Sequence, residues 1–478
     1  MKKRIIAIVM VLSLLLAVMA PVASAGASRK DTVLQFHQDG KFKIMMISDT
    51  QDTDKADQRM IHFIEASLDQ EKPDLVVFTG DNIAGRWVGS TAEKVRTAID
   101  KIIQPLVQRD IPFAVVFGNH DGESTVTTKE DQMAMFMAYD NCLAIDEGEA
   151  LDGVGTYNLP ILSSDGSRVA FNIYMMDSND YDANGNYDGV HQNQIDWYEQ
   201  TSNTLKAENG GDPVPSLLFQ HIPVPQIYSL LKQVPFGVMG SVRGSGRNAT
   251  KWYVMDESKA EGVVKEGPCP SYDDHGQYDS WLRQGDIAGA FFGHDHTNNM
   301  VGKTDEGITL GYNAGCSFHL YGDGLNRSMR MFVIDENDAW NYDTYLVKYG
   351  DIMPDDGGCL LVDLIAVRTI DNALLYGYQL IKQLFEGITG SPETEPSTAV
   401  SGTEPEGAPD TGPADSSATA QAGTGSTEPS DTTATERSEL FNGSAENPAT
   451  GVSLAIPVLA LVSTSAAVAF VLTRKKAK

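Results

Sequence analysis

The sequence predicts a single α/β domain at residues 31–350. Short continuous apolar runs, which are typical of strands buried on both faces, alternate with segments whose apolar residues recur at helical spacing. Five short polar blocks each follow directly after an apolar run. Alternating strands and helices form parallel sheets, and ligands collect beyond the carboxyl ends of their strands. The polar blocks therefore stand where a functional site would form.

The first half of the domain has the order strand, helix, strand, helix, strand. Residues 59–68 carry apolar side chains at helical spacing, and Ser90 with Glu93 forms a capping-box pattern that opens a second helix. The predicted strands are 43–47, 75–78, 113–117, 169–176, 217–220, 287–292 and 329–334, and the predicted helices are 59–68, a helix carrying Val95 to Leu106, and 194–205.

Residues 232–280 break this pattern because they are rich in glycine and polar side chains. A long insertion of this kind is often a loop that defines the substrate. The alternative is a disordered excursion without a role. Arg243 and Arg247 within it could clamp a phosphate, but we expect them to be solvated surface side chains.

The two ends of the chain predict export and anchoring. Residues 1–25 combine basic residues, an apolar stretch and a small-residue ending, which predicts a signal peptide cleaved after Ala25; an uncleaved anchor is the alternative.

Residues 351–386 predict a helical extension packed on the domain, with a membrane-surface helix as the alternative. Residues 387–446 have the composition of a disordered Ser/Thr/Pro/Glu-rich linker, and Val452–Thr473 is long and apolar enough to cross a membrane before a basic tail.

The net charge of −29 argues against nucleic-acid binding, which usually requires a basic patch, and it suits a soluble exported domain. Four cysteines, Cys142, Cys269, Cys316 and Cys359, have no zinc-site spacing. One or two disulfides or buried free thiols remain the alternatives.

The five polar blocks carry the donors that bind hard or borderline divalent metals. Carboxylate, amide and imidazole groups all occur, and a carboxylate can bridge two cations. Two ions about 3.5–4 Å apart could clamp the attacking and leaving oxygens of a phosphate ester. The blocks are Ser48-Asp49-Thr50-Gln51, Gly80-Asp81-Asn82, Gly118-Asn119-His120-Asp121, Gln220-His221 and Gly293-His294-Asp295-His296.

These blocks, in this order, resemble the calcineurin-like metallophosphoesterase superfamily, which includes the purple acid phosphatases. The resemblance covers about residues 40–340, and within the superfamily it is greatest to purple acid phosphatases that are named inactive. It implies a layered β-sandwich flanked by helices, a single catalytic domain at 31–350, and two divalent metal ions. The segments that carry it are Phe42–Ile44, Phe78–Ile83, His221–Pro223 and Gly293–Asn298.

The resemblance also implies a role for each site residue. The first ion would bind Asp49, Gln51, Asp81 and His296, and the second would bind Asp81, Asn119, His221 and His294. A metal-bound hydroxide would attack phosphorus in line, His120 would contact the phosphate and protonate the leaving oxygen, and Asp121 would orient His120.

Two positions depart from the family pattern. Gln51 stands where a histidine is usual, so the first ion would bind less tightly or be Mn²⁺, Fe²⁺ or Ca²⁺ rather than Zn²⁺. Ala84 stands where purple members carry a tyrosine, so we expect no purple colour. His319 is a candidate substrate contact only.

Asn447-Pro448-Ala449-Thr450-Gly451, before the apolar span, resembles a sortase sorting signal; a plain membrane anchor is the alternative. The expected partners are a sortase-type transpeptidase, the cell wall of a Gram-positive bacterium, and the membrane before processing. The sequence thus predicts a cell-surface phosphomonoesterase acting on a phosphate ester. The alternatives are a phosphodiesterase or nucleotidase, and an adhesin with a weakened site, which Gln51 alone supports.

Overall fold

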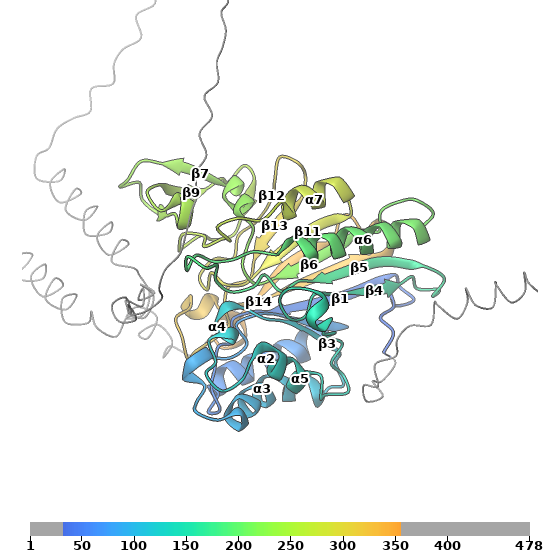
Figure 1. The fold of residues 1–478 in the computed structure, drawn as a ribbon, viewed down its shortest axis with the longest axis horizontal. Helices are drawn as coiled ribbons and strands as arrows, with labels where there is room; N and C mark the ends of the chain where they lie inside the picture. Colours follow the sequence, from blue (N-terminus) through green and yellow to red (C-terminus); the bar gives the residue numbers. More distant parts are fainter. Residues whose placement is uncertain (1–31, 355–478) are drawn as a thin grey trace, which may run out of the picture. The chain divides into compact units, whose positions relative to one another are not determined.

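The computed structural model describes residues 32–354. Two β-sheets are stacked, and helices cover the outer face of each (Figure 1). The first sheet has five strands in the order β15-β14-β1-β2-β3, and the second has seven in the order β10-β12-β13-β11-β6-β5-β4. This layered α/β architecture confirms the fold class that the sequence predicts.

The five-stranded sheet is built from β1 (Lys41–Ile47), β2 (Leu75–Thr79), β3 (Phe113–Val116), β14 (Ser328–Asp335) and β15 (Asp343–Lys348). The seven-stranded sheet is built from β4 (Tyr157–Leu162), β5 (Val169–Met175), β6 (Ser216–Gln220), β10 (Ala260–Glu261), β11 (Ile287–Phe292), β12 (Val301–Lys303) and β13 (Thr309–Tyr312). The α-helices are α2 (Gln58–Glu71), α3 (Ala92–Val107), α4 (Asn119–Gly122), α5 (Lys129–Phe136), α6 (Gln192–Glu208), α7 (Gln277–Gln284) and α8 (Tyr349–Ile352).

Parallel pairing brings the polar blocks to one edge of the fold. β1, β2 and β3 run parallel, with Ile44 opposite Leu75 and Val76 opposite Phe113. In the second sheet, β5, β6, β11 and β13 also run parallel to one another. Each of these strands is almost wholly buried, which is why its sequence is a continuous apolar run. All seven predicted strands are present.

Aromatic side chains fill the space between the two sheets. Phe219 of β6 and Phe291 of β11 both meet Phe332 of β14, with ring centroids 5.4 and 4.5 Å apart and steep interplanar angles. Such edge-to-face pairs are favoured over stacked rings. Helices α2, α3 and α5 cover the five-stranded sheet, and α6 and α7 cover the seven-stranded sheet (Figure 1). The core thus fixes the relative position of strands that contribute to the site from both sheets.

One local prediction is wrong, and one alternative is excluded. Helix α3 is preceded by Thr91 as its N-cap, whose side chain makes no capping hydrogen bond, so Ser90 and Glu93 do not form the expected capping box. The insertion at 232–280 is not a disordered excursion. It contains a three-stranded sheet of β7 (Leu231–Val234), β8 (Val242–Arg243) and β9 (Trp252–Met255), in the order β7-β9-β8.

The predicted signal peptide, the linker, the sorting signal and nearly all of the C-terminal extension lie outside the described residues. Among the residues that are described, no helix is long and apolar enough to cross a membrane. Cys269 and Cys316 are free thiols, and Cys316 is buried.

Candidate metal centre

The five polar blocks leave five strands and converge. The side chains of all seven predicted ligands are buried: Asp49, Gln51, Asp81, Asn119, His221, His294 and His296. Asp49 and Gln51 follow β1, Asp81 follows β2, Asn119 follows β3, His221 follows β6, and the two remaining histidines follow β11. The site is therefore assembled from both sheets at their carboxyl edges.

The ligand atoms form two clusters that share one carboxylate. Asp81, His221 and His294 have ligand atoms within 4.8 Å of one another, and so do Asp49, Asp81 and His296. His221 Nε2 lies 3.1 Å from Asp81 Oδ2, and His296 Nε2 lies 3.5 Å from Asp49 Oδ1. A shared carboxylate between two clusters is the arrangement that a dinuclear centre needs.

Buried polar atoms without partners show that the residues fit two cations. Asp49 Oδ2, Gln51 Oε1, Asn119 Oδ1 and His294 Nε2 are all buried and have no hydrogen-bond partner. An unsatisfied buried acceptor costs free energy unless something binds it, and each such group calls for an explanation. The three oxygens are the atoms that their residues would offer to a metal, and His294 in addition brings Nδ1 to 3.3 Å from His221 Nε2. The donor set is carboxylate, amide and imidazole, which suits divalent ions.

Main-chain carbonyls orient two of the imidazoles. Nδ1 of His221 lies 2.9 Å from the carbonyl oxygen of Thr79, and Nδ1 of His296 lies 3.0 Å from that of Tyr321. A ring nitrogen that donates to a carbonyl fixes the tautomer and leaves Nε2 as the lone-pair donor. Both histidines thus present Nε2 to the centre.

The backbone at the site is strained at several ligands. Asp49, Gln51, Asp81 and His294 have φ values of 52°, 32°, 51° and 75°. Non-glycine residues rarely adopt positive φ, and such residues cluster at functional sites. The site is also closely packed, because a Cβ on Gly118 would lie 2.2 Å from Asp81 Oδ1. Glycine at 118 therefore makes room for the shared carboxylate.

His120 differs from the ligands because its side chain is 27% exposed to solvent. Its backbone N–H donates to Asp81 Oδ1 at 2.9 Å, and its ring Nδ1 lies 3.0 Å from Glu123 Oε2. Asp121, which we expected to orient His120, instead accepts hydrogen bonds from backbone N–H groups of Gly118, Asn82 and Ile83. The expectation for Asp121 is corrected accordingly: Glu123 contacts the imidazole, and Asp121 holds the loops together.

The sequence matches the family model for calcineurin-like phosphoesterases over residues 42–298. This chain belongs to the calcineurin-like phosphoesterase family. Members are metal-dependent phosphoric ester hydrolases with a dinuclear metal centre, so the enzyme class that the sequence predicts is confirmed.

Curated relatives of the phosphoesterase include plant and yeast proteins. It is 30% identical over 353 residues to "Probable inactive purple acid phosphatase 29" of Arabidopsis thaliana, covering 67% of this chain and 82% of that protein. It is 31% identical over 334 residues to "Probable inactive purple acid phosphatase 14" of the same plant, covering 62% and 76%. It is 28% identical over 335 residues to "Phosphatase DCR2" of Saccharomyces cerevisiae, covering 64% and 53%.

The electrostatics of the phosphoesterase site follow from burial and close charges. Burial would raise the pKa of Asp81, but the imidazoles of His221 and His120 together lower it. Burial raises the pKa of Asp49 to about 7 and lowers that of His296 to about 4. A neutral His296 is the form that can coordinate a metal.

Two tyrosines beside the centre of the phosphoesterase, Tyr181 and Tyr321, were not predicted from the sequence. Tyr181 OH accepts a hydrogen bond from Asn119 Nδ2 at 2.9 Å, which turns Asn119 Oδ1 towards the centre. Tyr321 stacks on His296 with ring centroids 4.3 Å apart, and its hydroxyl donates to Glu266 at 2.9 Å. No motif marks these tyrosines, although Tyr321 lies two residues from His319, which is exposed.

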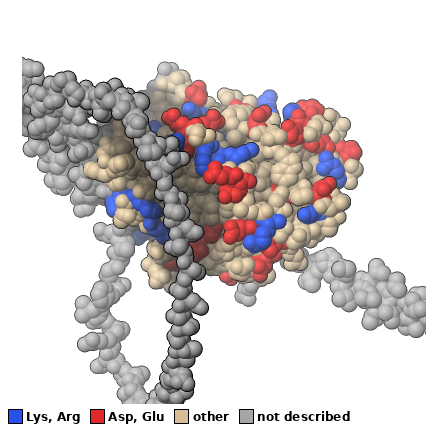
Figure 2. Space-filling view, turned by 90° about the horizontal axis from the view of Figure 1, so that it is seen from above, with Lys and Arg blue, Asp and Glu red and all other residues tan. Residues whose placement is uncertain are grey.

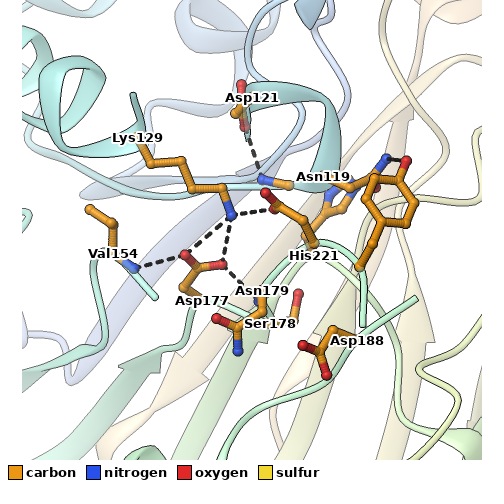
Figure 3. A network of polar contacts seen from close by, with 12 residues as sticks. Asn119, Asp121, Lys129, Val154, Asp177, Ser178, Asn179, Asp188 and His221 are labelled. Atoms are coloured by element: carbon orange, nitrogen blue, oxygen red, sulfur yellow. Dashed lines mark hydrogen bonds and ion pairs between the residues drawn. The ribbon is translucent and has the colours of Figure 1, made fainter. Parts of the chain in front are cut away.

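A buried lysine braces the wall of the phosphoesterase site. Lys129 Nζ lies 3.2 Å from Asp177 Oδ1 and 2.5 Å from Asp180 Oδ1, and Asp177 also accepts from the N–H groups of Val154 and Asn179 (Figure 3). Burial lowers the pKa of Lys129, but the two carboxylates outweigh it and raise the pKa overall. This network holds the segment after β5 against the start of α5.

Proposed function

We propose that this phosphoesterase is a cell-surface phosphomonoesterase that uses two divalent metal ions. One observation carries the proposal. Four buried atoms of the predicted ligands, on Asp49, Gln51, Asn119 and His294, have no hydrogen-bond partner. Two of these residues, Asp49 and His294, belong to the two ligand clusters that share Asp81. This is the pattern of a site whose remaining valences are met by cations.

When bound, the two ions would neutralise phosphate charge and supply an activated water at neutral pH. Asp49, Gln51, Asp81 and His296 would hold one ion, and Asp81, Asn119, His221 and His294 the other. Mn²⁺, Fe²⁺, Zn²⁺ and Ca²⁺ are the candidates, and the amide oxygen of Gln51 favours the harder ions.

His120 would act on the substrate rather than on the ions. It is the one partly exposed member of the cluster, and Glu123 fixes its ring. In this position it would hold a proton for the leaving oxygen of the ester, which is general acid catalysis. The role proposed for His120 rests on the partial exposure of its side chain and on its contact with Glu123.

Binding of an anionic ester would depend on short-range contacts. The chain carries a net charge of −29, and acidic and basic side chains are interspersed on the face that Figure 2 shows. A long-range field would therefore not concentrate phosphate esters at the site, and the ions would supply the attraction.

Activity towards a monoester is favoured because the curated relatives are named phosphatases. A panel of aryl monoesters, aryl diesters and nucleotides, assayed with Mn²⁺, tests this. Faster turnover of monoesters is expected, and a preference for diesters or nucleotides would replace the proposal with the alternative.

An adhesin with a weakened site is a second candidate, supported by Gln51 and by the word "inactive" in the names of the Arabidopsis relatives. Hydrolysis of a generic aryl phosphate separates the two. If the metal-loaded protein shows no turnover above background while both ions are bound, the adhesin is the better description.

The cell-surface location is proposed from the sequence patterns at residues 1–25, which predict a signal peptide, and at residues 447–451, which resemble a sorting signal. Deletion of residues 447–451 should move the protein from the wall fraction to the membrane fraction, with activity per molecule unchanged. If the parent protein already fractionates with the membrane, the segment is an ordinary anchor.

A further inference from the structure

We propose that Asp188, His191 and His275 bind a third divalent metal ion, for which Zn²⁺ is the best-suited species. The three residues offer ligand atoms within 4.8 Å of one another. They share no side chain with the dinuclear centre. Two imidazoles with one carboxylate form a donor set typical of zinc sites that keep an open fourth position.

The distances between the donor atoms suit a single ion. Asp188 Oδ2 lies 3.0 Å from His191 Nε2, and Asp188 Oδ1 lies 3.6 Å from His275 Nε2. Ligands about 2.0–2.1 Å from a tetrahedral zinc stand roughly 3.3 Å apart. The observed separations, one to each oxygen of Asp188, lie on either side of that value, and one ligand atom from each residue lies within 4.8 Å of the other two. The carboxylate thus stands between two imidazole nitrogens that both point towards it.

A second carboxylate, that of Asp152, orients the His191 ring for metal binding. Asp152 Oδ2 lies 2.7 Å from His191 Nδ1, on the side of the ring away from Asp188. A metal-bound histidine almost always donates its other N–H to a carboxylate or carbonyl, which fixes the tautomer and strengthens the ligand. An ion pair of protonated His191 with two aspartates would explain these contacts, but it would not explain why His275 brings a second imidazole nitrogen to Asp188.

The site is open to solvent, unlike the dinuclear centre. The side chains of Asp188, His191 and His275 keep 15%, 34% and 40% of their exposure. An ion can therefore enter without unfolding, and water can take the fourth position.

An ion here would tie the insertion to the body of the domain. His275 lies at the end of the insertion, and His191 is the N-cap of α6. Asp188 follows Tyr187, whose ring lies edge-on against His294 with centroids 4.3 Å apart. Asp188 also lies beside the segment that carries Asp177 and Asn179 (Figure 3). The third ion would thus fix the insertion close to the dinuclear centre and stabilise that wall of the site.

The test is a count of Zn²⁺ bound by the purified protein after equilibrium dialysis against buffered Zn²⁺, measured by elemental analysis. His275→Ala and Asp188→Asn should each bind one equivalent less than the wild type. His62→Ala is the matched control, since His62 is an exposed histidine on α2, and it should bind as much as the wild type. Because the result is a difference of one equivalent, it does not depend on whether the dinuclear centre fills.

A second measurement examines the orienting carboxylate. Asp152→Asn should weaken binding of the third equivalent about 10–100-fold, with the other equivalents unchanged. Thermal unfolding adds a readout, because Zn²⁺ should raise the Tm of the wild type more than that of His275→Ala. Equal zinc content in wild type and His275→Ala, with equal zinc-dependent shifts in Tm, would overturn the proposal.

Discussion

Gln51 donates a hydrogen bond from Nε2 to Oδ2 of Asp81, with the two atoms 2.7 Å apart. The same carboxylate oxygen lies 3.1 Å from His221 Nε2, and Gln51 Oε1 is left buried without a partner. The residue that departs from the family pattern is therefore built into the centre. It contacts the shared carboxylate through its nitrogen and offers its oxygen as a ligand.

Asp81→Asn should do more damage than Gln51→Ala. Asp81 belongs to both ligand clusters, whereas Gln51 would serve one ion with a neutral oxygen. Bound metal and turnover of aryl phosphate are to be compared in the two variants. We expect loss of both ions and near-complete loss of turnover for Asp81→Asn, and partial loss of one ion for Gln51→Ala. Retention of both ions by Asp81→Asn would show that the carboxylate does not bridge.

Gln51→His should shift the metal preference towards Zn²⁺ or Fe²⁺. An imidazole is a softer donor than an amide oxygen. Histidine is among the residues enriched at positive φ, so the φ of 32° at this position should be tolerated. Activation profiles with Mn²⁺, Zn²⁺ and Fe²⁺ measure the effect. An unchanged profile would mean that residue 51 does not contact the ion.

His120→Ala should leave both ions bound and reduce turnover by roughly 10²–10⁴-fold, the usual contribution of a general acid or base. The loss should be smaller for substrates with good leaving groups, which need less protonation. Turnover of aryl phosphates of differing phenol pKa measures this trend. Loss of metal would instead identify His120 as a ligand.

Glu123→Gln should reproduce a weaker form of that effect. Glu123 contacts the His120 ring and no predicted ligand. Metal content should stay at the wild-type value while turnover falls, most strongly for poor leaving groups. Asp121→Asn is the contrast: it loosens the loops that bind Asp121, so its main effect should be on the unfolding midpoint.

Lys129→Met should lower the free energy of unfolding by about 3–5 kcal/mol, because it leaves Asp177 and Asp180 without their cation in a buried setting. Lys101→Met is the control, since Lys101 is exposed on α3 and should change stability by less than about 0.5 kcal/mol. Urea unfolding of both variants measures the difference. Equal free energies of unfolding for the two variants would mean that the network makes no net contribution to stability.

The strands and the convergence of the blocks could be predicted because both depend on patterns along the chain. Continuous apolar runs mark buried parallel strands, and their carboxyl ends must meet at one edge. The role of Asp121 was mispredicted for a local reason. In the short helix α4, His120 and Asp121 are adjacent and face different directions, whereas Glu123 at i+3 shares a face with His120. Attention to helical spacing could have found Glu123.

Other features could not be predicted from sequence. Tertiary packing sets the positive φ values at Asp49, Asp81 and His294, and no local signal marks them. The insertion forms a small sheet although its strands are short and β8 has only two residues. Hydrogen bonds from Thr297 to Glu266 then join the insertion to the loop after β11, which carries His294 and His296.

The central claim is that hydrolysis depends on metal ions held around Asp81. Its most direct test is to strip the purified protein of metal, confirm the loss by elemental analysis, and follow aryl phosphate hydrolysis as Mn²⁺ is added back. The wild type should be inactive without metal and regain turnover as the two ions at the centre bind, while Asp81→Asn should stay inactive at the same Mn²⁺ concentrations. Full turnover by the metal-free protein, or full recovery by Asp81→Asn, would contradict the account.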